Sequence, residues 1–188
     1  MNKQRCLLVV SGPSGAGKDT VVSRLMQLHP EIELSVSATT RAPRAGEAEG
    51  VNYYFLTDEA FEAKIRRGEM LEYAGYCGRY YGTPKSEVDG RLEAGVTVVL
   101  VIEVQGAANI KRLYPESTLI FLMPPGIEEL RARLLGRGTE TAEAVERRLE
   151  RAKEEMAHAG EYDFTVVNRE VDACAEEIWR ILRARQSE

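Results

Sequence analysis

The sequence predicts an α/β fold in which a parallel sheet is flanked by helices, and three observations lead to this fold class. Apolar runs of strand length alternate with helical patterns along the chain. One of these runs, residues 5–11, leads directly into a G-x-x-x-x-G-K stretch at residues 12–18, with a helical pattern behind it. Residues 34–84 interrupt the alternation, which predicts a lobe inserted into the sheet domain.

The predicted core elements follow one another as in a doubly wound sheet. Its strands are expected at residues 5–11, 97–103, 119–123 and 164–168. Its helices are expected at residues 20–28, 107–114, 127–135 and 171–183. The strand candidates are continuous apolar runs, which is typical of parallel strands because helices cover both faces of such a sheet.

Residues 34–84 are predicted to form a small β-rich lobe. They contain two alternating segments, at 53–56 and 70–76, and one helical pattern at 58–67. Many turn residues separate these short segments, which is typical of antiparallel or mixed β-structure.

Residues 136–160 are strongly charged, open with Gly-Arg-Gly and continue into a polar helical pattern at 142–158. This segment is either an arginine-bearing lid or a solvated surface helix, and its charge fits both interpretations. We therefore expect a core made of residues 1–33, 85–135 and 161–188, an inserted lobe at 34–84 and a lid at 136–160.

Composition excludes several classes of protein. The 188 residues are enough for one domain with an inserted lobe, and a hydrophobic content of 44% excludes a disordered chain. The net charge of −5 disfavours general nucleic-acid binding, so we expect no nucleic-acid partner. Phosphate groups must then be bound by local arginines, because the chain as a whole repels anions.

Cysteine and histidine usage points to an intracellular protein without a zinc site. Cys6, Cys77 and Cys174 are scattered and form no C-x-x-C pair, which is typical of a reducing compartment. His29 and His158 stand alone. We find no leader peptide and no apolar run long enough to span a membrane, so we expect a cytoplasmic protein with no membrane partner. The sequence leaves the oligomeric state open.

The glycine-rich stretch is a candidate phosphate-binding loop. Glycines let successive backbone N–H groups point at one anion, and the following helix adds its positive N-terminal end. A lysine at the end of the loop supplies a mobile positive charge for the β- and γ-phosphates of a nucleotide. The residues predicted to bind ATP phosphates here are Gly12, Pro13, Ser14, Gly15, Ala16, Gly17 and Lys18.

One position of this loop departs from the usual motif. A serine or threonine hydroxyl normally follows the lysine and binds the metal ion, whereas this chain has Asp19 followed by Thr20. Asp19 either serves as a favourable first-turn residue of the helix or takes part in binding the metal. We therefore assign both residues to the ATP site and leave the metal ligand open between them.

Eight short motifs, spread over essentially the whole chain, occur in the order of one known family. They are SVSATTRAPRAGE at 35–47, GVNYYF at 50–55, LEY at 71–73, RYYGT at 79–83, EVQG at 103–106, GRGT at 136–139, RRL at 147–149 and YD at 162–163. Together they closely resemble guanylate kinase. The resemblance implies a P-loop NTPase core with an inserted GMP-binding lobe and a helical lid. It also implies the reaction ATP + GMP → ADP + GDP, with magnesium as the cofactor.

Four residues of the lobe are candidates for binding the GMP phosphate. Arg41 and Arg44 are three residues apart in a loop stiffened by Pro43, so two guanidinium groups can converge on one anion. Tyr53 and Tyr81 match family positions whose hydroxyls help to hold the same phosphate. By themselves these tyrosines are more typical of core packing, and the resemblance reverses that preference.

Recognition of the guanine base is expected from Ser37, Glu72 and Thr83. Guanine carries N1–H and N2–H₂ donors side by side, which match the two acceptors of a carboxylate, and its O6 needs a hydroxyl donor. Adenine would turn an unprotonated N1 toward the same carboxylate, so one glutamate both attracts guanine and rejects adenine. Without the resemblance, Glu72 reads as a strand-edge charge facing water. The family pattern also places Glu103 in the GMP site.

Phosphoryl transfer needs positioning and positive charge more than covalent chemistry from the protein. The candidates for this charge are Lys18 and Arg41, and the resemblance adds Arg137 and Arg148, with Arg133 a weaker candidate on the same helix face as Arg137. No general base is evident, and none is required, because the attacking GMP phosphate is already anionic near pH 7.

Two further positions bear on the ATP side. Asn168 ends a predicted strand where the family lines the adenine pocket, although it also reads as a simple strand-ending residue. Val101 stands where family members usually have a carboxylate, two residues before Glu103. An added carboxylate at Asp19 and a missing one at Val101 raise the hypothesis that the first compensates for the second.

Two other functions compete with this interpretation. A guanylate-kinase-like scaffold would use the lobe to bind phosphorylated peptides, but such modules usually have a degraded phosphate loop, and here the loop is intact. A P-loop kinase for another small phosphorylated substrate would not need the combination of Ser37, Glu72 and Thr83, which argues for guanine.

Overall fold

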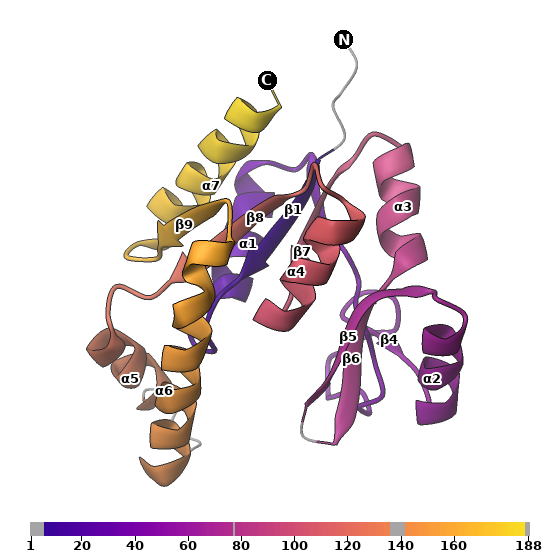
Figure 1. Ribbon diagram of the computed structural model, residues 1–188, viewed down its shortest axis with the longest axis horizontal. Helices are drawn as coiled ribbons and strands as arrows, with labels where there is room; N and C mark the ends of the chain where they lie inside the picture. Colours follow the sequence, from indigo (N-terminus) through magenta and orange to yellow (C-terminus); the bar gives the residue numbers. More distant parts are fainter. Residues whose placement is uncertain (1–5, 77, 136–141, 187–188) are drawn as a thin grey trace.

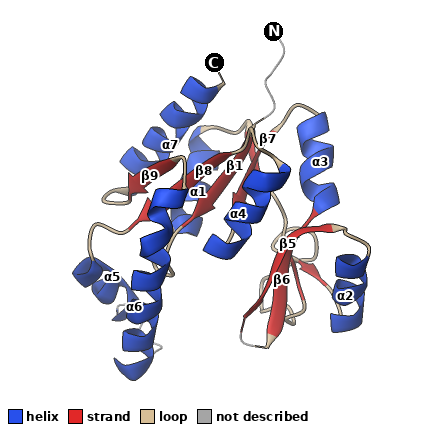
Figure 2. Cartoon of the chain, viewed as in Figure 1, coloured by secondary structure: helices blue, strands red, loops and turns tan. Residues whose placement is uncertain are grey.

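A five-stranded parallel sheet forms the centre of the molecule, and helices cover both of its faces (Figures 1 and 2). The computed structural model describes residues 6–76, 78–135 and 142–186. In spatial order the strands are β2 (Ile32–Leu34), β7 (Thr97–Val101), β1 (Leu7–Ser11), β8 (Thr118–Met123) and β9 (Phe164–Val167). All four neighbouring pairs of this sheet are parallel, as the alternation of strands and helices predicts.

Each face of the sheet has its own hydrophobic core. On one face lie α1 (Lys18–Leu28) and α7 (Val171–Arg185), which pack against each other and against the strands. On the other lie α3 (Lys85–Glu93) and α4 (Val104–Leu113). The central strand β1 is buried along its whole length, because helices cover it on both sides.

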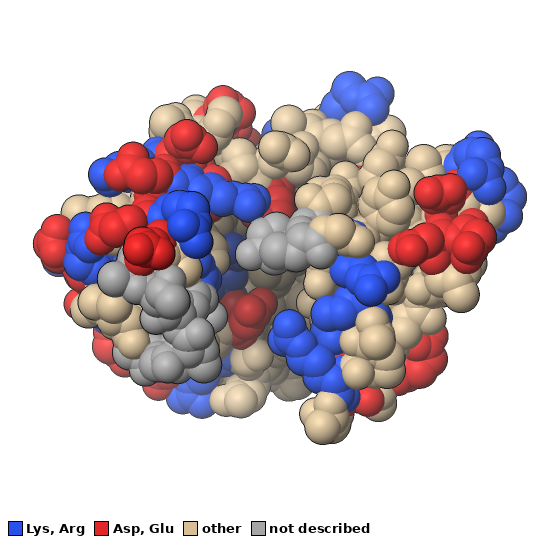
Figure 3. Space-filling view, turned by 90° about the horizontal axis from the view of Figure 1, so that it is seen from below, with Lys and Arg blue, Asp and Glu red and all other residues tan. Residues whose placement is uncertain are grey.

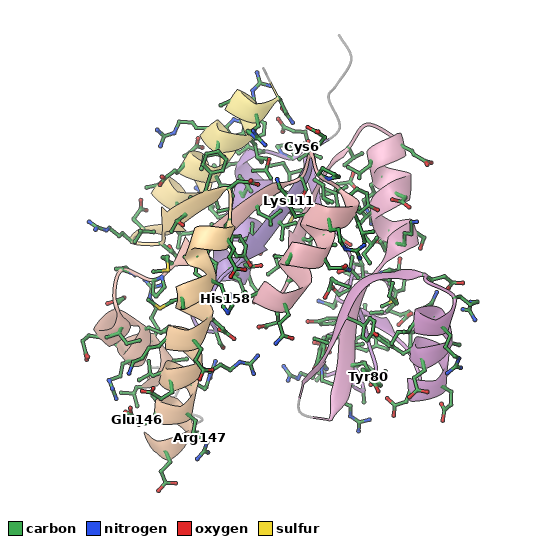
Figure 4. All side chains as sticks on the ribbon, in the orientation of Figure 1. Cys6, Tyr80, Lys111, Glu146, Arg147 and His158 are labelled. Atoms are coloured by element: carbon green, nitrogen blue, oxygen red, sulfur yellow. The ribbon has the colours of Figure 1, made fainter. Side chains whose placement is uncertain are left out.

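The inserted lobe is a second sheet with a helix packed on it. Its strands, in spatial order, are β4 (Tyr54–Phe55), β3 (Ala38–Thr39), β6 (Arg79–Pro84) and β5 (Met70–Tyr76). The helix is α2 (Asp58–Arg66), whose first turn is capped by the Thr57 hydroxyl, which accepts from the Ala60 N–H at 3.2 Å. Tyr80 lies in this lobe and stacks on Phe61 of α2 with ring centroids 5.3 Å apart (Figure 4).

Two further helices pack on each other at the side of the sheet. These are α5 (Ile127–Leu135) and α6 (Ala142–Met156), which share a small apolar core, and a short 3₁₀ helix, η1 (Ala157–Glu161), follows α6. Glu146 pairs with Arg131 of α5, and Figure 4 shows Glu146 and Arg147 near the end of α6 that is far from the sheet. The other end of α6 approaches the phosphate loop.

The predicted fold class is confirmed, while several element boundaries were wrong. The strand expected at 97–103 ends at Val101, because Glu103 has N-cap geometry and α4 begins three residues before its expected start. The helix expected to run to residue 158 ends at Met156 and tightens into η1. Four elements were not predicted, namely β2, β3, β6 and α3. Within the described residues no helix is long and apolar enough to cross a membrane.

Candidate active site

A cavity of about 370 Å³ lies between the core and the lobe. It is bordered by the phosphate loop and the start of α1, by the end of β7, and by lobe strands β5 and β6. Seen from below, basic side chains face the hollow from both sides, with acidic side chains between them (Figure 3). The lining residues are Ser14, Gly15, Gly17, Lys18, Asp19, Thr20, Ser37, Tyr53, Glu72, Ala74, Tyr81, Gly82, Val101, Ile102 and Glu103.

The phosphate loop needs its glycines for both conformation and space. Gly12, Gly15 and Gly17 all have positive φ angles, of 148°, 91° and 93°. A Cβ at Gly12 would lie 2.2 Å from the carbonyl oxygen of Leu122, and one at Gly17 would lie 2.5 Å from Nδ2 of Asn168. The loop is therefore packed directly against the end of the sheet.

Lys18 is the first residue of α1 and folds back over the loop. Its Nζ donates to the carbonyl oxygens of Gly12, at 2.6 Å, and Pro13, at 3.2 Å. Burial lowers the pKa of this ammonium, while the nearby carboxylates of Glu103, Glu155 and Asp19 act in the opposite direction. The charge of Lys18 is thus held at the loop, in the lining of the cavity.

Asn168 and Arg133 stabilise the phosphate loop through hydrogen bonds to backbone carbonyl oxygens. The buried Asn168 donates through Nδ2 to the carbonyl oxygen of Ala16 at 2.8 Å. Arg133 of α5 donates to the Asn168 carbonyl at 3.1 Å and reaches the same Ala16 carbonyl at 3.4 Å. Asn168 does not line the cavity in this structure, so its contact with the loop is the observed one and its expected adenine contact stays a prediction.

Helix α6 contacts the phosphate loop through two side chains. Nη2 of Arg148 donates to the Ser14 hydroxyl at 2.7 Å. The carboxylate of Glu155 accepts from the Ser14 backbone N–H at 3.3 Å and from Nε of Arg151 at 2.9 Å. Arg151 also lies 3.7 Å from the carboxylate of Glu103. These contacts link α6 to both the loop and the start of α4.

Glu72 and Thr83 meet across the β5–β6 pair. The Thr83 hydroxyl donates to Oε1 of Glu72 at 2.6 Å, and the two residues are register partners. Burial raises the pKa of the Glu72 carboxyl, and the bonds from Thr83 oppose this rise. Glu72 and Ser37 both line the cavity, whereas Thr83 lies buried behind Glu72. The predicted guanine-recognition residues are therefore close together in the structure.

Arg41 is already paired with a carboxylate. Its two terminal nitrogens donate to Glu47, both at 2.9 Å, and its guanidinium lies 5.4 Å from the Tyr53 ring centroid. Tyr53 in turn packs edge-on against Tyr81, at 6.1 Å between ring centroids. Arg41 and the Arg44 N–H together lower the pKa of Glu47 to about 2. Arg44 itself is exposed, and its backbone N–H donates to Glu47 at 2.7 Å.

Within the described residues the structure shows no contact that supports the expected role of three predicted site residues. Arg137 lies outside the described residues. Asp19 and Thr20 are both exposed at the start of α1 and line the cavity. Among the described residues no group of three or more His, Cys, Asp or Glu side chains is arranged to hold a metal ion by itself.

Sequence reasoning missed two carboxylates of the site, Glu47 and Glu155. Glu47 ends the motif at 35–47. Its position six residues after Arg41, in a turn that contains glycine, was the signal that could have indicated an ion pair between the two side chains. Glu155 is separated from Ser14 by 141 positions and sits four residues after Arg151 in a charged helix. That spacing is typical of an ordinary surface ion pair, so no local signal distinguished it.

Comparisons with known proteins agree with this geometry. The sequence profile of the family described as guanylate kinase matches residues 4–185. The guanylate kinase of Lactococcus lactis is 50% identical over 98% of this chain and 90% of its own length, and that of Prochlorococcus marinus is 46% identical over 98% and 100%. The chain belongs to the guanylate kinase family.

A solved structure supports the same assignment. The crystal structure of guanylate kinase from Anaplasma phagocytophilum superimposes with a TM-score of 0.81 at 36% identity, over 99% of this chain and 88% of the other. As in other guanylate kinases, the activity is that of an ATP:GMP phosphotransferase, a nucleoside monophosphate kinase that forms ADP and GDP. The predicted enzyme class is confirmed.

A glycine of α4 makes room for the carboxylate of Glu72 and provides a test. A Cβ at Gly106 would lie 2.9 Å from Oε2 of Glu72 and 3.1 Å from its Cγ, so Gly106→Ala must displace the carboxylate. Alanine also strengthens a helix interior by about 0.5–1 kcal/mol. We expect a protein at least as stable as the wild type, and the predicted contact of Glu72 with the base implies a roughly tenfold rise in the KM for GMP.

The control for Gly106→Ala is Gly90→Ala in α3, where a Cβ would meet nothing within 4 Å. It should give the helix stabilisation without a change in KM. Thermal unfolding and steady-state kinetics measure both effects. An unchanged KM for GMP in Gly106→Ala would show either that the Glu72 side chain can move away from the added methyl group without losing its function, or that it does not contact the base.

Proposed function

We propose that ATP binds to the phosphate loop and GMP binds in the lobe, so that the two substrates meet in the cavity between them. The observation that carries this proposal is that Lys18 and Glu72, the best candidates for the two substrates' anchoring groups, line one cavity of about 370 Å³. The loop N–H groups and the N-terminus of α1 suit the phosphates of ATP. The carboxylate of Glu72 suits the adjacent donors of guanine.

In this arrangement the protein accelerates transfer through position and charge. The GMP phosphate is the nucleophile and needs no general base, while Lys18 and Arg148 supply positive charge where the transferred group moves. Arg148 already contacts the loop through Ser14. We include Arg41 and Arg137 in this catalytic set, and we take α6 as the described part of the lid expected at residues 136–160.

Magnesium fits the donors at the start of α1. Mg²⁺ prefers hard oxygen ligands and usually combines one or two carboxylates with substrate phosphates and water. Asp19 and Glu103 offer carboxylates and Thr20 a hydroxyl, and all three line the cavity. We propose Asp19 or Thr20 as the protein ligand. When bound, the ion neutralises charge on the phosphates of ATP and helps to orient them.

A coupled assay of ADP release with GMP, AMP, UMP and CMP tests the proposed substrate choice. We expect turnover with GMP to exceed that with each other nucleotide by several orders of magnitude, because only guanine presents adjacent donors to Glu72. Comparable turnover of another monophosphate would contradict the proposed contact between guanine and Glu72.

Conservative changes at the lobe arginines test where the GMP phosphate binds. Arg41→Lys and Arg44→Lys keep the charge but lose the planar guanidinium, which can bind an oxyanion through two hydrogen bonds. We expect each to raise the KM for GMP roughly tenfold and to leave the KM for ATP within about twofold. Arg79→Lys, at an exposed position of β6, is the matched control. Equal effects on both substrates would contradict the placement of these arginines at the GMP phosphate.

A further inference from the structure

The carboxylate of Glu155 lies on the phosphate loop itself. Its side chain is only 11% exposed, and it accepts from the Ser14 backbone N–H at 3.3 Å and from Nε of Arg151 at 2.9 Å. Ser14 belongs to the loop whose N–H groups are shaped to receive an anion. The loop therefore contacts a negative charge of the chain itself, supplied by a residue 141 positions further along the sequence.

Glu155 lies near two cations that also act at the loop, Lys18 and Arg148. Glu155 is one of the carboxylates that favour the charged form of Lys18, against the burial that disfavours it. Arg148, from the same helix, donates to the Ser14 hydroxyl at 2.7 Å. Ser14 thus contacts two charged side chains of α6, the cation of Arg148 and the anion of Glu155. A nucleotide phosphate bound at the loop would compete with Glu155.

We propose that Glu155 occupies the place of a nucleotide phosphate at the loop and is exchanged for it when ATP binds. The proposal rests on the proposed function in one respect, namely that the phosphates of ATP bind to this loop. Two anions repel each other strongly at such short range, so an incoming phosphate must displace the carboxylate. A polyphosphate makes enough contacts at once to do so, whereas a single small anion makes few.

Arg41 shows the same arrangement on the other side of the cavity. Its guanidinium is occupied by both oxygens of Glu47, at 2.9 Å each, although it is a candidate for binding the GMP phosphate. On each side of the cavity, therefore, a carboxylate of the chain is hydrogen-bonded to a group that is a candidate for binding phosphate: Glu155 to the loop, and Glu47 to Arg41. The two pairs are independent, because one joins α6 to the loop and the other lies wholly within the lobe.

The proposal is tested by the affinity of the free enzyme for inorganic tripolyphosphate, measured by calorimetry without GMP. Glu155→Gln keeps the size and one acceptor oxygen but removes the charge. Glu155→Met is a second neutral variant that keeps the length and suits a mostly buried position. We expect both to bind tripolyphosphate roughly tenfold more tightly than the wild type, because one opposing charge is gone.

The matched control is Glu154→Gln, which removes the same charge from the neighbouring, exposed position of α6. It should change the affinity less than twofold. An unchanged or weaker affinity in the Glu155 variants, or an equal gain in Glu154→Gln, would overturn the exchange. Melting temperatures establish which variants are folded and can be compared.

Steady-state kinetics supply a readout that a purely structural residue would not give. Glu155→Gln should lower the KM for ATP while the KM for GMP stays within about twofold. Parallel changes in both would overturn the proposal. The two proposals fail differently, because tight tripolyphosphate binding without GMP turnover would contradict the proposed substrates alone. Normal GMP turnover with unaltered tripolyphosphate affinity would contradict the exchange alone.

Discussion

Replacing Glu72 with glutamine should lower kcat/KM for GMP by two or more orders of magnitude. The change keeps the side chain's size but turns one acceptor oxygen into an NH₂ donor, which would face N1–H or N2–H₂ of guanine. Buried sites that read such donors discriminate by about 10⁴–10⁵, because the mismatched groups are left unpaired. If the amide turns its NH₂ group to the Thr83 hydroxyl, which can accept as well as donate, only one acceptor oxygen is left for two guanine donors.

Three measurements make the Glu72 prediction specific. The KM for ATP should barely change, because ATP binds at the loop. Activity with AMP should become measurable, because an amide can donate to adenine N1. Glu59→Gln, at an exposed position of α2, should leave all constants unchanged. A retained preference for GMP in Glu72→Gln would remove the main residue-level reason for placing guanine in the lobe.

The raised pKa of Glu72 adds a pH dependence with a definite sign. Because burial raises this pKa, the carboxyl takes up its proton at a higher pH than an exposed glutamate does. The protonated form has only one acceptor oxygen for two guanine donors. The KM for GMP should therefore rise more steeply on acidification in the wild type than in Glu72→Gln, where only the protonation of the GMP phosphate remains.

Removing the ammonium group of Lys18 should reduce kcat about a hundred- to a thousandfold. Loss of one preorganised charge at a transferred group typically costs about 3–4 kcal/mol of transition-state stabilisation. Lys18→Met keeps much of the apolar stem, and Lys18→Ala removes it as well, so the pair separates lost packing from lost charge. Both should show the same loss of kcat if charge is what matters.

The fold should survive the Lys18 substitutions. The hydrogen bonds of Nζ within the described residues go to two carbonyl oxygens of the loop, which lies beside an open cavity where water can replace them. Lys85→Ala, at an exposed position of α3, serves as the control. A folded Lys18 variant with nearly full activity would show that this ammonium does not act on the transition state.

Much of the core could be predicted because its signals are local. Buried parallel strands such as β1 and β8 are continuous apolar runs, and α7 places Cys174, Ile178 and Leu182 on one stripe at helical spacing. The missed elements lack such signals. Strand β2 has three residues, of which one is buried. Helix α3 has Gly90 in its interior, and β6 contains a glycine and ends in proline, so their local preferences contradict their structure.

The sequence by itself determined the chemistry available to this protein. A glycine-rich loop between a strand and a helix can only be a sharp, amide-lined turn, and the spacing of Arg41, Glu72 and the later motifs identified the family. Only the tertiary structure decided which groups face one another. Glu155 contacts Ser14 across 141 positions, and Glu72 of the lobe lies against Gly106 of the core, because these contacts depend on how the elements pack. Local patterns encode the elements, and long-range packing selects their partners.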